Sequence, residues 1–256
     1  KWSPDWPFGG TQLAWSPDGA QLLYVAASPA GNGTDLWLIN ADGTGAPVNI
    51  TAAPGDDFHP TWCGDGSIWF TSLRANNTHQ IFTTTLADYD NGLRPRNISG
   101  THNFPREYDP VLLPDGDCQR LMFVTTLQGR PEIWRYFLDC PNCYRVVRTE
   151  RDNNGAAEEP ALSADGVYIA YTRRIAETAE IVVGEALNRL VNVQVTDSGA
   201  NSQPQFSPDG QWLVFTSTRD GNREIYRMAR DGAGQTNLTQ DAATDTDPVW
   251  QPVALP

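Results

Sequence analysis

The stretch that decides the fold is residues 204–217, which reads Pro204-Gln205-Phe206-Ser207-Pro208-Asp209-Gly210-Gln211-Trp212-Leu213-Val214-Phe215-Thr216-Ser217. Its centre, Ser-Pro-Asp-Gly, is a turn: the proline presets φ at the first corner, and the glycine supplies a positive φ at the exit. The run that follows, residues 213–217, is rich in β-branched and aromatic residues, which indicates a strand.

The same unit recurs along the chain. The equivalents of Phe206 and its turn lie at residues 15–19, 62–66, 112–116 and 162–166, with spacings of 47, 50, 50 and 44 residues. A period in the forties is typical of propeller blades, in which four strands form one unit. A third strand follows each polar turn, as in Glu224-Ile225-Tyr226, and a short fourth strand ends in a sequence such as Leu238-Thr239.

We therefore predict an all-β protein, a β-propeller of four-stranded antiparallel blades, with five blades favoured and six possible. We place the whole chain, 1–256, in one domain. The sequence contains no convincing amphipathic helix. The expected units are the repeats 11–57, 58–107, 108–157, 158–201 and 202–245, followed by a terminal strand, 246–256.

Residues 204–239 resemble, almost position for position, the WD40-like propeller repeat of the TolB-like family. The resemblance covers nearly the whole chain and is weakest in the fourth repeat. It implies a propeller, an extracytoplasmic location (periplasmic, cell surface or secreted), and a protein partner, because TolB uses its propeller to bind the peptidoglycan-associated lipoprotein. Two departures are the five full units in place of the usual six and the lack of the family's amino-terminal helical domain.

The surplus segment around Trp250 leaves the closure of the ring open. The simplest interpretation is five blades with a short tail. A second is a six-bladed ring whose last blade is completed by sequence not present here. A third is pairing of this segment with another subunit, because edge strands are ready templates for strand addition.

The net charge of the chain disfavours two classes of partner. The 256 residues include 31 Asp and Glu against 18 Lys and Arg, of which 17 are Arg, and the formal net charge is −13. This composition disfavours nucleic acids and anionic membranes, which require clustered basic residues. No apolar run of about 18 residues occurs, so no membrane-inserted helix is expected.

The connections into the innermost strands should ring one mouth of the central channel. Seven carboxylates, one histidine and one glutamine fall there and form the candidate partner-binding site. They are Asp57, His59, Glu107, Asp109, Glu158, Glu159, Gln203, Asp245 and Asp247. The functional interpretation is docking of a basic or polar peptide, and the structural interpretation is local capping of the strand by polar side chains.

Enzymatic and metal chemistry find little support in the motifs. No catalytic residues are assigned, because Gly-x-Ser-x-Gly is missing and no glycosidase motif singles out a carboxylate pair. We expect no cofactor and no metal, although the acidic mouth leaves calcium open. His59, His79 and His102 lack metal-ligand spacing and are expected to be solvated loop residues.

The four cysteines are expected on the face opposite the acidic mouth, at turns of the second and third repeats. Disulfides are favoured over a four-cysteine zinc site or a redox Cys-x-x-Cys. Two pairings stay open: Cys118 with Cys140, or Cys140 with Cys143 together with Cys63 with Cys118. Among five sequons, Asn32 and Asn76 are the better glycosylation candidates.

The favoured function is an extracytoplasmic binding or assembly module that contacts a protein or peptide through one propeller face. The first alternative is a structural subunit of an extracellular filament or surface assembly that associates through its terminal strand. The second is an enzyme, either a carbohydrate-active propeller or the propeller part of a peptidase.

Overall fold

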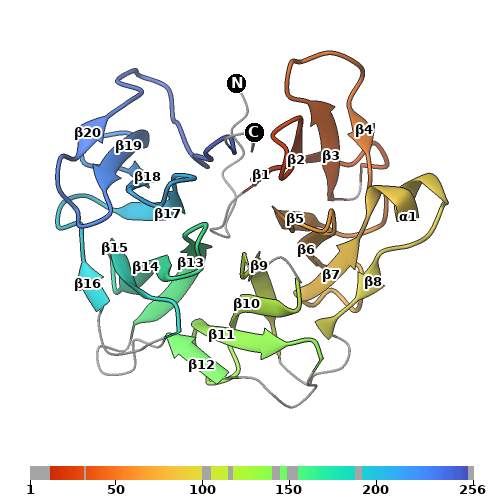
Figure 1. The fold of residues 1–256 in the computed structure, drawn as a ribbon, viewed down its shortest axis with the longest axis horizontal. Coiled ribbons are helices and arrows are strands. Elements are labelled where there is room, and N and C mark those ends of the chain that lie inside the picture. Colours follow the sequence, from red (N-terminus) through yellow and green to blue (C-terminus); the bar gives the residue numbers. More distant parts are fainter. Residues whose placement is uncertain are drawn as a thin grey trace.

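Five four-stranded antiparallel sheets stand around a central axis in the computed structural model, which confirms the predicted five-bladed propeller (Figure 1). The structure describes residues 12–31, 33–99, 105–114, 118–139, 145–148, 155–187 and 192–252. Each blade is a meander in which strands consecutive in sequence pair with one another, so every blade is built from local contacts.

The strands follow the order of the repeats. Blade 1 contains β1 (Leu13–Trp15), β2 (Gln21–Ala27), β3 (Thr34–Asn40) and β4 (Val48–Asn49). Blade 2 contains β5 (Asp57–Trp62), β6 (Ile68–Ser72), β7 (Gln80–Thr84) and β8 (Arg96–Asn97). Blade 3 contains β9 (Glu107–Leu112), β10 (Arg120–Thr125), β11 (Glu132–Phe137) and β12 (Arg145–Arg148). Blade 4 contains β13 (Ala156–Leu162), β14 (Tyr168–Ile175), β15 (Thr178–Glu185) and β16 (Asn192–Gln194). Blade 5 contains β17 (Asn201–Phe206), β18 (Trp212–Ser217), β19 (Glu224–Ala229) and β20 (Thr236–Asn237).

One helix departs from the prediction. Helix α1 (Leu86–Asp90) lies between β7 and β8, and a capping box fixes its start: Thr85 accepts from the Asp88 backbone, and Asp88 accepts from the Thr85 backbone. The sequence Thr-x-x-Asp is the signal for such a cap. A five-residue helix is too short to show an apolar periodicity, so only the cap could have revealed it.

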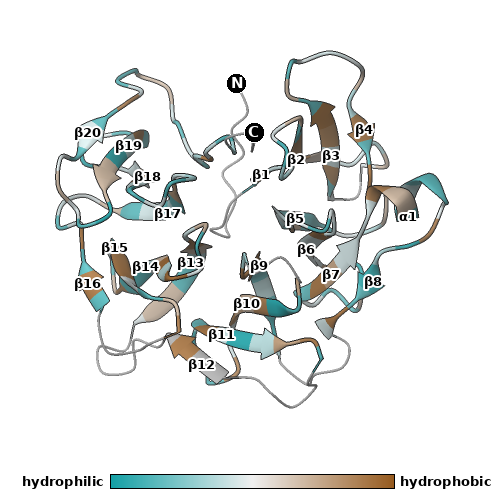
Figure 2. Ribbon diagram, in the orientation of Figure 1, coloured by the Kyte–Doolittle hydropathy of each residue, from teal (hydrophilic) through white to brown (hydrophobic). Residues whose placement is uncertain are grey.

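The hydrophobic core is divided among the contacts between neighbouring blades. In β10, Leu121 and Phe123 pack toward blade 2, whereas Met122 and Val124 pack toward blade 4. Successive residues of a strand point to opposite faces, so a blade buried on both sides carries an unbroken apolar run. Figure 2 shows hydrophobic residues in many of the strands and hydrophilic residues in many of the turns.

Arginine side chains brace two of the blades, which helps to explain why nearly all the basic residues are arginine. The guanidinium of Arg74 lies 5.3 Å from the ring centroid of Phe70 and 5.2 Å from that of Phe82. Arg219 lies over Phe215 and Tyr226 in the same way, at 5.5 and 4.5 Å. A planar, weakly hydrated guanidinium can stack on aromatic faces and still donate hydrogen bonds, which a lysine ammonium does less well.

The Ser-x-Asp-Gly turns between the first two strands of blades 1, 4 and 5 share one hydrogen-bond pattern. The serine hydroxyl donates to the aspartate Oδ1 two residues later, at 2.6 Å for Ser16, 2.6 Å for Ser163 and 2.5 Å for Ser207. These bonds, with a second one from a backbone N–H, lower the pKa of Asp18, Asp165 and Asp209. These carboxylates are structural parts of the repeat.

Residues 246–252 lie between blade 5 and blade 1, where a sixth blade would stand. The Trp250 indole Nε1 donates to the Gln205 carbonyl at 3.2 Å, and the Gln251 side chain donates to the Gly19 carbonyl at 3.4 Å. Gly19 has φ +68°, and a Cβ there would come within 3.3 Å of the Pro252 carbonyl. The expected terminal strand is therefore not a paired strand over these residues; side chains, rather than a backbone ladder, connect it to both neighbours.

Candidate functional site

The candidate site is built on a kink that four inner strands share. His59, Asp109, Glu159 and Gln203 each precede a proline and have φ between 51° and 56°. The pairing of the inner strand with its neighbour shifts register at each of these positions, which marks a β-bulge. Asp247 precedes Pro248 and has φ 59°, so residues 246–252 repeat the kink without a blade attached. A bulge re-aims a side chain, and here it aims a polar one toward the next blade.

Three of the kinked residues and Gln12 form a hydrogen-bonded chain from blade 4 to blade 1, called here the polar belt (Glu159, Gln203, Asp247 and Gln12). The Gln203 backbone N–H donates to Glu159 Oε2 at 2.8 Å. The Asp247 N–H donates to Gln203 Oε1 at 3.2 Å, and the Gln12 N–H donates to Asp247 Oδ1 at 3.3 Å. Each side chain thus satisfies a backbone donor of the following repeat, and Asp247 connects the last repeat to the first.

Threonines of the second strands hold two belt side chains in place. The Thr172 hydroxyl donates to Glu159 Oε2 at 2.5 Å, and the Thr216 hydroxyl donates to Gln203 Oε1 at 2.9 Å. In blade 2 the Thr71 hydroxyl instead accepts the Asp109 N–H at 3.0 Å. Threonine hydroxyls therefore hold the kinked residues both within a blade and between neighbouring blades.

An ion-pair cluster adjoins the belt at blades 3 and 4. Arg174 binds Glu158 at 2.9 Å and Glu159 at 3.2 Å, and the Tyr108 hydroxyl donates to Glu158 Oε1 at 3.1 Å. Burial, and then the charges of Glu159 and Glu158, raise the pKa of Asp109 well above its usual range. Burial and the Glu159 charge also raise the pKa of Glu158.

Three further carboxylates of the predicted mouth have raised pKa values. Burial raises the pKa of Asp57 to about 6, although Arg74 lies 2.5 Å away and opposes the shift. Burial likewise raises the pKa of Glu107 to about 7 and that of Asp247 to about 6. Carboxylates with such shifts gather at functional sites, although structural clusters produce them too.

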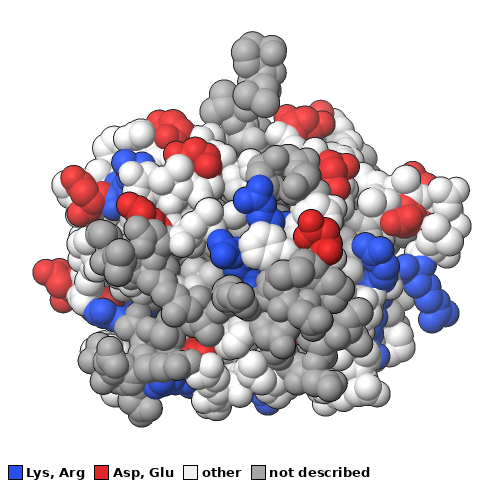
Figure 3. All heavy atoms as spheres, turned by 60° about the horizontal axis from the view of Figure 1, so that its bottom comes forward, with Lys and Arg blue, Asp and Glu red and all other residues white. Residues whose placement is uncertain are grey.

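The structure separates the predicted mouth residues by exposure. Buried members, with at most 5% of their surface exposed, are Asp57, His59, Glu107, Asp109 and Glu159. Partly exposed members are Glu158, Gln203, Asp245 and Asp247. A partner at this mouth would therefore touch the blade 4 and blade 5 side of the ring, while the buried members position their neighbours. Among the described residues on the face drawn in Figure 3, acidic and basic side chains are interspersed.

The expectation of solvated histidines is wrong for two of the three. His59 and His79 are buried, and both pack near Phe58, with ring centroids 4.8 and 5.6 Å away. Both also approach Tyr108 of blade 3. Burial is the main cause of the lowered pKa of His79. This cluster joins two blades, and sequence alone does not show which loops meet. His102 lies outside the described residues.

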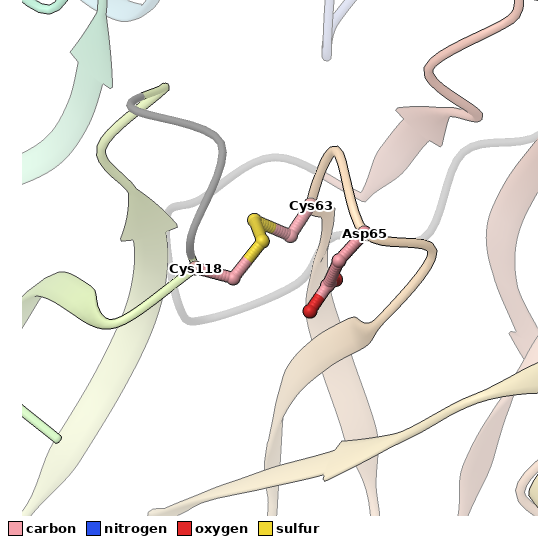
Figure 4. Close-up of side chains that lie close together, drawn as sticks. All are labelled: Cys63, Asp65 and Cys118. Carbon is pink, nitrogen blue, oxygen red and sulfur yellow. A yellow bond between two sulfur atoms is a disulfide. The ribbon is translucent and has the colours of Figure 1, made fainter. Parts of the chain in front are cut away.

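A disulfide joins Cys63 of blade 2 to Cys118 of blade 3, with the Cα atoms 6.1 Å apart (Figure 4). The pairing of Cys118 with Cys140 is therefore wrong, because Cys118 is already bonded across the blade interface. Cys140 and Cys143 lie outside the described part of the chain. Of the glycosylation candidates, Asn76 is exposed in a turn with φ 59°, and Asn32 also falls outside the described ranges.

The mouth does not gather ligands tightly enough to indicate a metal. In the described residues, one group of three His, Cys, Asp or Glu side chains has its ligand atoms within 4.8 Å of one another, and it is Cys63, Asp65 and Cys118. It lies at the turns after the first strands of blades 2 and 3, the opposite end of these strands from the belt.

Comparison with known proteins agrees with this architecture. Residues 156–254 match the family model described as the TolB beta propeller domain. Over these residues the chain resembles the TolB β-propeller. The Tol-Pal system protein TolB of Anaeromyxobacter dehalogenans (strain 2CP-C) is 44% identical over 55 residues, which cover 22% of this chain and 11% of that protein.

Two solved structures share the fold of this TolB-like propeller over nearly its whole length. TolB from Acinetobacter baumannii superposes with a TM-score of 0.79 and 23% identity, covering 94% of this chain and 57% of that one. A putative TolB from Agrobacterium tumefaciens gives 0.75 and 17%, covering 94% and 86%. These identities establish the fold alone. No helix long and apolar enough to span a bilayer occurs in the residues that the structure describes.

Proposed function

We propose that this TolB-like propeller is an extracytoplasmic module that binds a protein through the channel mouth and does not act as an enzyme. The observation that carries the proposal is the cluster around the polar belt, where the buried Asp109 and Glu159 adjoin the partly exposed Glu158 and Gln203. Asp245 is a further partly exposed carboxylate of the mouth. Fixed acceptors next to low-dielectric walls favour a partner that presents N–H donors or basic side chains.

The name of the curated relatives, Tol-Pal system protein TolB, suggests the class of partner. We infer a peptidoglycan-associated lipoprotein, which belongs to the compartment outside the cytoplasmic membrane. The extracytoplasmic location is supported further by the disulfide, because such bonds persist in oxidising compartments.

The filament alternative gains little support from the position of residues 246–252. The side chains of Asp247, Trp250 and Gln251 bond to blades 5 and 1 of the same chain, which favours a place for this segment within its own ring. Mass under native conditions would test this alternative directly, since a filament subunit would be found above 28.2 kDa.

The test of the binding role is a titration of the lipoprotein's periplasmic domain, from the same genome, against the propeller by calorimetry. The variant Glu158→Gln with Asp245→Asn removes two mouth charges and keeps the size of both side chains. We expect its Kd to rise at least about tenfold, since losing charged contacts costs more than 1.4 kcal/mol.

The matched control is Asp165→Asn with Asp209→Asn, which makes the same change of charge in turns at the other end of blades 4 and 5. The control should bind like the natural sequence. Equal affinity in all three proteins, or no binding at all, would show that the mouth does not bind this lipoprotein.

A further inference from the structure

The turn after the first strand of blade 2 differs from three others at one chemically important position. Cys63 stands where blades 1, 4 and 5 have Ser16, Ser163 and Ser207. The turn keeps the aspartate contact, since the Ser67 N–H donates to Asp65 Oδ1 at 2.8 Å. It is one residue shorter than the serine turns: the Cys63 N–H donates to the Ser67 carbonyl at 2.8 Å, whereas the Ser16 N–H donates to the Gln21 carbonyl. In the serine turns this geometry brings the hydroxyl against the carboxylate. In blade 2 it brings a sulfur there.

A second sulfur reaches the same place from the neighbouring blade. Cys118 has φ 52°, a left-handed conformation that is costly for a residue other than glycine, and it faces Cys63 across the interface. Figure 4 shows the three side chains together, with the carboxylate of Asp65 beside the bridge. The two sulfurs and a carboxylate oxygen all lie within 4.8 Å of one another.

The surroundings of these atoms differ on their two sides. Cys63 and Cys118 are 5% and 2% exposed, and they pack in the cluster that contains Trp69, Leu121 and Trp134. Asp65 is exposed. The sulfurs are thus held in an apolar wall, while the carboxylate side is open to solvent and gives an ion a path of entry.

We propose that reduction of the Cys63–Cys118 disulfide opens a site for a thiophilic divalent cation such as Zn²⁺ or Cd²⁺, bound by both sulfurs and the Asp65 carboxylate. Two thiolates, one carboxylate and one water complete the four-coordinate set that zinc prefers. Zn–S bonds of about 2.3 Å and Zn–O bonds of about 2.0–2.2 Å place ligands about 3.5–3.8 Å apart, which is compatible with this cluster.

The reaction that opens the site is thiol–disulfide exchange with an external dithiol. The dithiol is oxidised to its own disulfide, and its two electrons and two protons convert the Cys63–Cys118 bond into two thiols. Each thiol then releases its proton when it ligates the cation. Apolar surroundings disfavour the charged thiolate form of a buried thiol. The positive charge of the bound cation offsets this cost and stabilises both thiolates.

This inference extends beyond the proposed binding role, since the cluster lies at the end of the inner strands away from the mouth. The test uses the full chain with Cys140→Ser and Cys143→Ser, so that the other two cysteines cannot contribute thiolates. The protein is reduced with a dithiol, desalted without oxygen and titrated with Cd²⁺, and thiolate–cadmium absorption in the near ultraviolet is followed. We expect one ion per chain after reduction and none with the disulfide intact.

Asp65→Asn tests the carboxylate, and Asp165→Asn, in the equivalent turn of blade 4, is its control. We expect Asp65→Asn to weaken Cd²⁺ binding at least about tenfold and Asp165→Asn to leave it unchanged. Binding that is equally tight in both variants would overturn the three-ligand site, and absence of binding after reduction would overturn the proposal altogether. Circular dichroism of the reduced protein verifies that the propeller remains folded, and a Tm that rises with Zn²⁺ concentration provides an independent readout.

Discussion

Glu107 should make the propeller less stable as the pH rises. Its side chain is 3% exposed at the start of β9, and burial raises its pKa from 4.5 to about 7, against a hydrogen bond from Ser99. Between these two values the folded protein keeps the proton while the unfolded chain loses it. The free energy of unfolding therefore falls with rising pH across this window and levels off above about pH 7.

The magnitude follows from the size of the shift. A difference of about 2.5 pKa units at about 1.36 kcal/mol per unit corresponds to roughly 3 kcal/mol lost between pH 4.5 and pH 8. Asp57, whose pKa is raised to about 6, changes stability in the same direction over a lower window. Glu107→Gln keeps the shape and removes the charge, so it should match the natural protein near pH 4.5 and exceed its stability at pH 8.

Urea unfolding at pH 4.5, 6, 7 and 8, followed by tryptophan fluorescence, measures both effects. Asp18→Asn is the matched control: Asp18 is exposed and its pKa is lowered by Ser16, so its contribution is lost only as the pH falls through its pKa. The reasoning would be refuted if stability rose between pH 5 and pH 8. It would also fail if Glu107→Gln changed stability equally at pH 4.5 and pH 8.

Two further changes probe the joints between blades. Cys63→Ser removes a disulfide that closes a loop of 55 residues, and loop-closure entropy predicts a loss of about 4 kcal/mol in the free energy of unfolding. Urea unfolding measures this loss, and a value under about 1 kcal/mol would contradict the entropic account. Asp247→Ala removes the acceptor for the Gln203 side chain and the Gln12 N–H, so hydrogen exchange at Gln12 should accelerate while exchange at Val124 stays slow. Asp247→Asn retains an acceptor oxygen and should exchange more like the natural protein.

The blades could be predicted from the sequence because the residues that determine each turn and strand lie within a few positions of one another. The Ser207-Pro208-Asp209-Gly210 turn and the strand after it show their conformation within a few residues, and repetition of this unit gives the meander and the period. The Cys63–Cys118 bond was one of two pairings left open, because the distance between neighbouring blades is not encoded in either turn.

The belt was missed for a specific physical reason. A residue before proline favours extended conformations, so a left-handed Glu159 or Gln203 runs against the local rule. Hydrogen bonds from the next repeat stabilise this conformation, and those bonds exist only once neighbouring repeats have packed together. The polar residue before each inner-strand proline was visible, but its burial and its structural role were not. The buried His79 follows the same logic, since its neighbours come from two blades.

The contact between Asp247 and Gln12 also bears on how the chain folds. It joins residues 235 positions apart, whereas each blade is assembled from strands adjacent in sequence. Bringing such distant residues together costs roughly 5 kcal/mol of chain entropy, so meanders should form early and this contact last. The folding chain would then pass through an intermediate in which the blades are formed but the ring is open. The lifetime of this intermediate would depend on how fast Asp247 bonds to Gln12.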